Sequence, residues 1–187
     1  MQFQSCSPTA IFAPRLKNQR GAGTEVHRKY IALAKQMLGF EKAKFTAWTE
    51  NVDTTAAVHL KASIITTDSS GVLVTNFHPD LMRLIRETRY LDRMGFDIPE
   101  VALSVCLQES KYHAYVEGLT QMLDAYHAVT SGLSEVDRSL LSARLTALRR
   151  VLDPGFSPLN WNSLGVMDFI ATATTASTEF QSLVSQV

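Results

Sequence analysis

The chain has 187 residues, of which 45% are hydrophobic, which is typical of one folded domain with a sizeable core. Its 18 basic and 18 acidic side chains cancel, whereas nucleic-acid-binding proteins normally carry a basic excess. No apolar run approaches the roughly 18 residues of a membrane span. Neither Cys6 nor Cys106 lies in a disulfide or metal-binding pattern. We therefore expect a soluble protein of a reducing compartment that binds neither nucleic acid nor membrane.

The first 24 residues differ from the rest in composition. They are rich in Ser, Pro, Gly and basic residues, and no acid precedes Glu25. This composition weakly resembles that of a mitochondrial transit peptide. We interpret residues 1–24 as a flexible or misassigned leader, with mitochondrial targeting as the alternative, and residues 25–187 as the folded helical segment.

A long helix, bent or straight, is predicted from Glu25 to about Val52. Its apolar residues recur at steps of three and four, which places them on one stripe: Val26, Tyr30, Leu33, Met37, Phe45, Trp48 and Val52. Thr24 is the expected N-cap, and Gly39 the expected position of any kink.

The next segment changes to β-branched residues. The runs Ser63–Thr67 and Val72–Thr75 flank the turn-forming sequence Asp68–Gly71. This pattern predicts a short β-hairpin or an extended crossover near residues 62–77.

Pro79 suits the first position of a helix over Asp80–Met94, and Gly95 suits its end. The outer face of this helix carries the candidate partner contacts Arg83, Arg86, Arg89 and Arg93, because guanidinium groups pair well with carboxylates. The alternative is a solvated face with local pairs such as Arg83–Glu87. Pro99 is expected to start a further short helix in the same way.

Later residues predict three more helices. A seam of apolar residues at Tyr112, Tyr115, Leu119, Met122, Tyr126 and Val129 ends at Gly132. A helix capped by Ser134 runs to Pro154-Gly155 and is expected to pack antiparallel against that seam. Trp161 is expected to fill the interior, and a final apolar helix follows Ser163. The fold class is therefore mainly α, an elongated helical bundle of about six helices with a minor β element.

Signals for catalysis, cofactors and metals are missing from the sequence. The five histidines include no pair at a spacing of three or four, no phosphate-binding loop occurs, and no nucleophile elbow occurs. We expect no enzyme activity, no cofactor and no metal site.

Several motifs together resemble the N-terminal tail region of dynein heavy chains. They comprise Phe40-Glu41 with Trp48, the sequence from Val74 to Leu81, the sequence from Leu84 to Leu91, Gly95–Glu100, Leu107–Tyr112 and Pro154–Ser163. The similarity extends from about Thr24 to the C-terminus and is greatest to axonemal heavy chains, of outer-arm type. His78 departs from the family, which usually has an acid there, and we expect this change to affect only a contact at the helix start.

The resemblance implies a non-catalytic tail segment that helps to assemble the motor complex. Its partners would be dynein intermediate and light chains or a neighbouring heavy chain, in the cytoskeleton of a cilium or flagellum. Residues expected to shape the fold are Asn76, Phe77, Pro79, Gly95, Pro99, Gly155 and Trp161. The alternatives are a free-standing helical adaptor outside a motor and a small mitochondrial helical protein.

Overall fold

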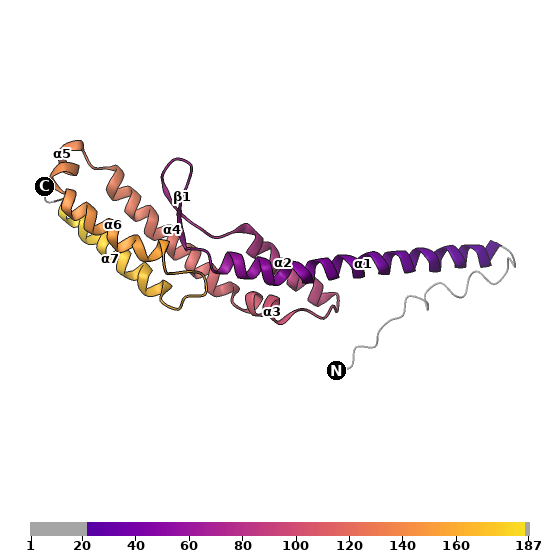
Figure 1. Ribbon diagram of the computed structural model, residues 1–187. Coiled ribbons are helices and arrows are strands. Elements are labelled where there is room, and N and C mark those ends of the chain that lie inside the picture. Colours follow the sequence, from indigo (N-terminus) through magenta and orange to yellow (C-terminus); the bar gives the residue numbers. More distant parts are fainter. Residues whose placement is uncertain (1–21, 186–187) are drawn as a thin grey trace. The chain divides into compact units, whose positions relative to one another are not determined.

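The computed structural model describes residues 22–185, which fall into two compact units, residues 22–48 and 49–185 (Figure 1). The described part is mainly helical with one small antiparallel sheet, which confirms the predicted fold class. Seven helices occur there, against about six expected from the spacing of apolar residues. The predicted leader lies outside the described residues except for its last three positions, which already belong to the first helix.

Helix α1 (Ala22–Leu60) contributes Ala22–Trp48 to the first unit and Thr49–Leu60 to the second. It begins two residues before the predicted N-cap, so Thr24 lies in its first turn instead of capping it. Gly39 is accommodated within the helix. No helix in residues 22–185 combines the length and the apolarity needed to cross a membrane.

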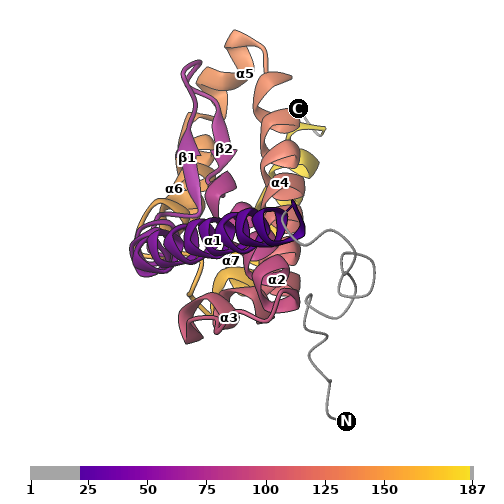
Figure 2. The same ribbon diagram turned by 90° about the vertical axis from the view of Figure 1, so that its right-hand side faces the viewer.

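A short β-hairpin follows α1. The sequence predicted either this hairpin or an extended crossover, and the structure has the hairpin. Strand β1 (Ile65–Thr67) pairs antiparallel with β2 (Leu73–Thr75), as Figure 2 shows. The Asp68 carboxylate accepts hydrogen bonds from the backbone amides of Ser70 and Val72 at 2.8 and 2.9 Å, and Gly71 takes a φ of 81°. The Asp and Gly of this turn therefore supply the local geometry that reverses the chain.

Trp161 lies at the centre of the junction between the hairpin and the helices. Its side chain is fully buried, and its indole Nε1 donates to the Asn76 carbonyl at 2.9 Å. The side-chain amide of Asn76 in turn donates from Nδ2 to the Ser63 carbonyl at 2.9 Å. The Phe77 ring meets the indole edge to face, with ring centroids 4.7 Å apart. Trp161 is thus an internal anchor, as predicted, and not a surface group.

Two helices then follow the hairpin. Helix α2 (Pro79–Arg93) has Pro79 at its first position and is followed by Gly95 with a φ of 83°, as predicted. Helix α3 (Glu100–Leu107) has Pro99 as its N-cap. Pro99 was expected at the first helical position, so the helix begins one residue later than predicted. Proline suits either place because its missing N–H is not needed there.

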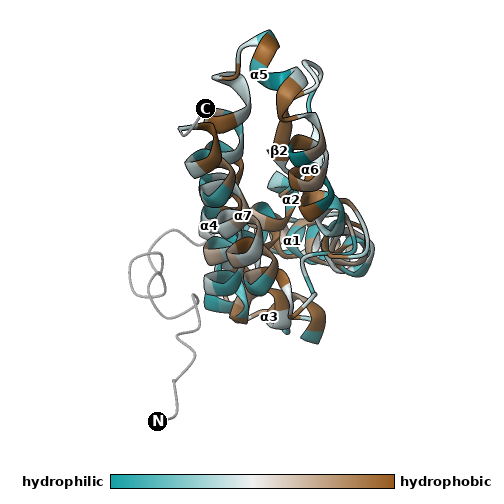
Figure 3. Ribbon diagram, turned by 90° about the vertical axis from the view of Figure 1, so that its left-hand side faces the viewer, coloured by the Kyte–Doolittle hydropathy of each residue, from teal (hydrophilic) through white to brown (hydrophobic). Residues whose placement is uncertain are grey.

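Helix α4 (Glu109–Ser131) buries its complete predicted seam. Helix α7 (Val166–Val184) packs extensively on α4 and also on α6 (Ser142–Phe156), and Figure 1 shows these helices side by side. Hydrophobic and hydrophilic residues are both visible along α4 and α6 (Figure 3). The helical part of the core is therefore built where the apolar side of α7 meets those of α4 and of α6.

The predicted helix from Ser134 to Pro154-Gly155 is wrong in its continuity, whereas its predicted end lies within one residue of the observed one. Helix α5 (Glu135–Leu140) stops at Leu141, and α6 then runs on through Pro154 to Phe156. Ser134 does cap α5, accepting from the Asp137 amide at 3.2 Å. Pro154 lies in the last turn of α6, two residues before its end, so the distortion that its ring and missing N–H impose affects little of the helix.

Candidate functional site

Helix α2 separates its two faces as the sequence predicted. Leu81, Leu84, Ile85 and Thr88 are buried, and Thr88 satisfies its hydroxyl by donating to the Leu84 carbonyl at 2.7 Å. The four predicted arginines all lie on exposed positions of the opposite side. The structure thus brings these arginines to one face, but their surroundings differ.

Two of the four arginines are held by carboxylates of the same unit. Arg83 contacts Asp80 at 3.1 Å and Glu87 at 3.8 Å, the second being the local pair that the sequence suggested. Arg89 donates through both terminal nitrogens to the Glu109 carboxylate on α4. The negative charge of Glu109 raises the pKa of the Arg89 guanidinium. These two arginines therefore contribute to contacts within the protein.

The other two arginines, Arg86 and Arg93, form no ion pair with any residue in the described range 22–185. Tyr90, 66% exposed, lies between them at steps of four and three residues, and Met94, 49% exposed, adjoins them at the end of the helix. We call Arg86, Tyr90, Arg93 and Met94 the α2 patch. Sequence reasoning found its arginines but missed Tyr90 and Met94, whose exposure depends on what packs against α2.

The α2 patch has the composition of a protein-binding surface. Tyrosine and arginine are enriched among residues that dominate binding energy, and methionine adapts to irregular apolar surfaces. Two unpaired guanidinium groups favour an acidic counterpart through bidentate hydrogen bonds. The patch is therefore suited to recognition of an acidic protein surface.

Four of the residues expected to shape the fold belong to the hairpin junction and to α6. Asn76, Phe77 and Trp161 meet at the junction described above. Gly155 is buried, and a Cβ atom there would lie 2.5 Å from the Ile65 Cδ1 atom, which leaves no room for a larger residue. Gly155 therefore lets α6 approach the hairpin closely.

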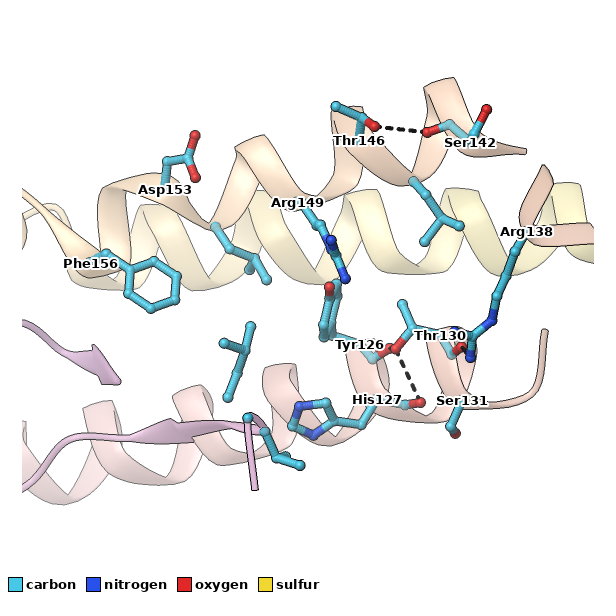
Figure 4. Close-up of a pocket in the computed structure, with 15 residues that line it drawn as sticks. Tyr126, His127, Thr130, Ser131, Arg138, Ser142, Thr146, Arg149, Asp153 and Phe156 are labelled. Carbon is cyan, nitrogen blue, oxygen red and sulfur yellow. Dashed lines mark hydrogen bonds between the residues drawn. The ribbon is translucent and has the colours of Figure 1, made fainter. Parts of the chain in front are cut away.

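A groove of about 970 Å³ separates α4 from α6 and reaches the hairpin turn (Figure 4). The lining side chains come from both helices, among them Tyr126 and His127 of α4 and Arg149 of α6. Arg138 at its end donates to the carbonyls of Thr130 and Leu133 and so caps the end of α4. The expected direct packing of these consecutive helices is therefore replaced by packing of each on α7.

One cluster was missed by sequence reasoning. His59, at the end of α1, lies beside His78 and Asp80 at the start of α2, with ring centroids of the two histidines 3.8 Å apart. The Asp80 amide also donates to His78 Nδ1 at 3.2 Å, which is the helix-start contact expected for this position. Spacings within one helix could not reveal the cluster, because the hairpin returns the chain between residues 59 and 78.

Comparison with known proteins identifies the family. Residues 12–169 match the family described as dynein heavy chain, N-terminal region 1. The chain is 46% identical over 88% of its length to the Dynein-1-alpha heavy chain of the flagellar inner arm I1 complex from Chlamydomonas reinhardtii. It is 36% identical over 88% of its length to human Dynein axonemal heavy chain 10.

Identity to the flagellar outer-arm Dynein gamma chain of Chlamydomonas reinhardtii is 26% over 86% of the chain. The axonemal resemblance is confirmed, but these identities do not favour the outer-arm type over the inner-arm type. The chain spans only 4% of the length of these relatives. It belongs to the dynein heavy-chain family and corresponds to the N-terminal region of axonemal members.

Proposed function

We propose that this chain is a non-catalytic segment of a dynein heavy-chain tail, and that it helps to assemble the motor complex in the axoneme of a cilium or flagellum. Its partners are dynein intermediate and light chains or a neighbouring heavy chain. The proposal rests first on the family match, which covers residues 12–169.

The α2 patch is the surface through which we expect this segment to bind. Arg86 and Arg93 are exposed and unpaired within the described residues, whereas Arg83 and Arg89 are occupied by neighbouring carboxylates. This difference in ion pairing between the two pairs of arginines is the main support for the proposed contact. It restricts the predicted four-arginine face to two arginines around an exposed tyrosine, and it favours an acidic surface on the partner.

The test compares two double charge reversals in the tagged 187-residue chain. One variant carries Arg86→Glu and Arg93→Glu in the α2 patch. The matched control carries Arg144→Glu and Arg150→Glu on α6, where both arginines are also exposed. Both variants change the net charge equally, so a difference between them reports position and not total charge.

Each chain is used to capture proteins from flagellar extract, and dynein intermediate, light and heavy chains are quantified by mass spectrometry. We expect the α2 variant to lower recovery of one of these subunits at least tenfold and the α6 control to leave it unchanged. Equal recovery with both variants would contradict binding through the α2 patch. Failure of the unmodified chain to recover any dynein subunit would contradict the assembly role itself.

A further inference from the structure

The cluster of His59, His78 and Asp80 brings together three potential metal ligands from two helices. One ligand atom from each residue lies within 4.8 Å of the others. His59 Nε2 lies 3.7 Å from Asp80 Oδ2, and His78 Nδ1 lies 3.5 Å from the same oxygen. All three residues belong to the second unit, so their proximity is a property of one compact body.

These distances approach those of a zinc site. With bonds of about 2.0–2.2 Å in tetrahedral geometry, neighbouring donor atoms lie about 3.3–3.6 Å apart. The distance between His59 Nε2 and Asp80 Oδ2 therefore needs little change to fit a tetrahedral edge. Two imidazoles and a carboxylate also form a donor set that suits zinc and its first-row neighbours.

We infer that His59, His78 and Asp80 form a binding site for a divalent transition-metal ion of the zinc class. The three side chains supply three ligands, and water or a group from a partner completes the coordination. The ion would connect the last turn of α1 to the first turn of α2, on either side of the hairpin.

The surroundings of the cluster prepare its ligands for a cation. Arg83 Nη2 lies 3.1 Å from Asp80 Oδ1, which orients the carboxylate so that Oδ2 faces the imidazoles. Arg83 is 62% exposed, so solvent screens much of its repulsion of an ion. Partial burial, and secondarily the neighbouring His78, lowers the pKa of His59.

Binding requires one local rearrangement. The His59 and His78 rings are stacked at an interplanar angle of 9°, and a metal ion lies in the plane of each ring that ligates it. One ring must therefore turn. His78 is 45% exposed, so its ring has room to rotate, which exchanges its contact with the Asp80 amide for a metal bond. Coordination of residues 59 and 78 by one ion then ties the ends of the hairpin segment together.

Titration calorimetry with zinc chloride on the 187-residue chain tests the site. The variants are His59→Gln and His78→Asn, because asparagine retains the ability to cap α2. The matched control is His113→Gln, which removes an exposed histidine paired with a single carboxylate, Glu109, at 3.8 Å. Binding of cobalt(II), followed by its visible absorption, reports whether the coordination is tetrahedral and whether thiolates take part.

We expect binding of one zinc ion per chain, a tetrahedral cobalt spectrum without thiolate bands, and an affinity at least tenfold lower in both cluster variants but not in the control. At zinc concentrations about 100 times Kd, Tm should rise by about 5–10 °C. Unchanged affinity in folded His59→Gln and His78→Asn chains would overturn the proposal. So would a thiolate spectrum, or the absence of zinc binding. Melting in EDTA, with Tm within about 2 °C of the original, establishes that the variants are folded.

Discussion

The two units of this chain use the same amphipathic pattern with opposite outcomes. In the first unit, Val26, Tyr30, Leu33 and Met37 form the predicted apolar stripe, yet each is at least 46% exposed. In the second unit, all six residues of the predicted seam of α4 are buried. Helical periodicity therefore predicts the helix in both cases, whereas burial depends on whether another element covers the stripe.

The difference has a consequence for stability. Side chains of the second unit are held by packing on several neighbours, and their removal leaves cavities or unsatisfied groups. The exposed stripe of the first unit adds little to folding by itself, and such a surface is available for association with another helix. Equivalent substitutions in the two units should therefore have very different effects.

The largest expected effect is that of Trp161→Ala. This change removes a fully buried indole, its hydrogen bond to Asn76 and its contact with Phe77, so the free energy of unfolding should fall by about 3–5 kcal/mol. Phe40→Ala in the first unit removes a side chain that is 63% exposed. This variant should change the free energy of unfolding by less than about 0.5 kcal/mol. Urea denaturation of both variants measures this contrast. Similar losses would show that the first unit is packed as tightly as the second.

A smaller contrast comes from two glycines in helices. Gly155→Ala places a Cβ atom 2.5 Å from the Ile65 side chain, and the resulting overpacking should destabilise the second unit by about 1–3 kcal/mol. Gly39→Ala meets nothing within 4 Å and should stabilise α1 by about 0.5–1 kcal/mol, because alanine loses less backbone entropy. Urea denaturation measures the loss of stability in the Gly155 variant. Circular dichroism of the helical signal measures the stabilisation of α1 in the Gly39 variant. A stabilised Gly155→Ala chain would contradict the close approach of α6 and the hairpin.

The smallest effect concerns the buried hydroxyl of Tyr112, which has no hydrogen-bond partner among the described residues. Burial, and then the neighbouring Tyr115, raises the pKa of Tyr112 above its ordinary value of 10.0. The unfolded chain therefore ionises first, so the stability due to this group is complete below pH 10 and is lost as the pH rises through the raised folded value.

Tyr112→Phe should match or exceed the original stability at pH 7, by up to about 1 kcal/mol, because it removes an unsatisfied polar group. It should also lose less stability than the original chain between pH 9 and about pH 11. Urea denaturation across this range compares the two chains. A destabilised variant at pH 7 would indicate that the hydroxyl has a partner in solution.

Local signals in the sequence were sufficient for most of the secondary structure. The hairpin follows from β-branched runs around an Asp–Gly turn, and α2 follows from Pro79 and Gly95 at its two ends. Local rules failed at Leu141, where a continuous apolar pattern is interrupted between α5 and α6. They placed the end of α6 within one residue, at Pro154-Gly155 against the observed Phe156.

The candidate sites were predicted less completely than the helices. The arginine face was found because all four side chains share one helix, whereas the pairing of Arg89 with Glu109 joins two helices. The metal-ligand cluster was not found, because His59 and His78 lie on opposite sides of the hairpin. Contacts between distant parts of a chain leave no fixed spacing in the sequence.

The sequence by itself determined the helical class, the position of the hairpin and the outward direction of the arginines, because these depend on periodicity and on the backbone preferences of proline, glycine and aspartate. Only the tertiary structure decided which apolar stripes are buried, which arginines remain unpaired and which histidines meet. The physical reason is that burial, ion pairing and ligand geometry are set by what lies nearby in space, and the fold chooses those neighbours from anywhere along the chain.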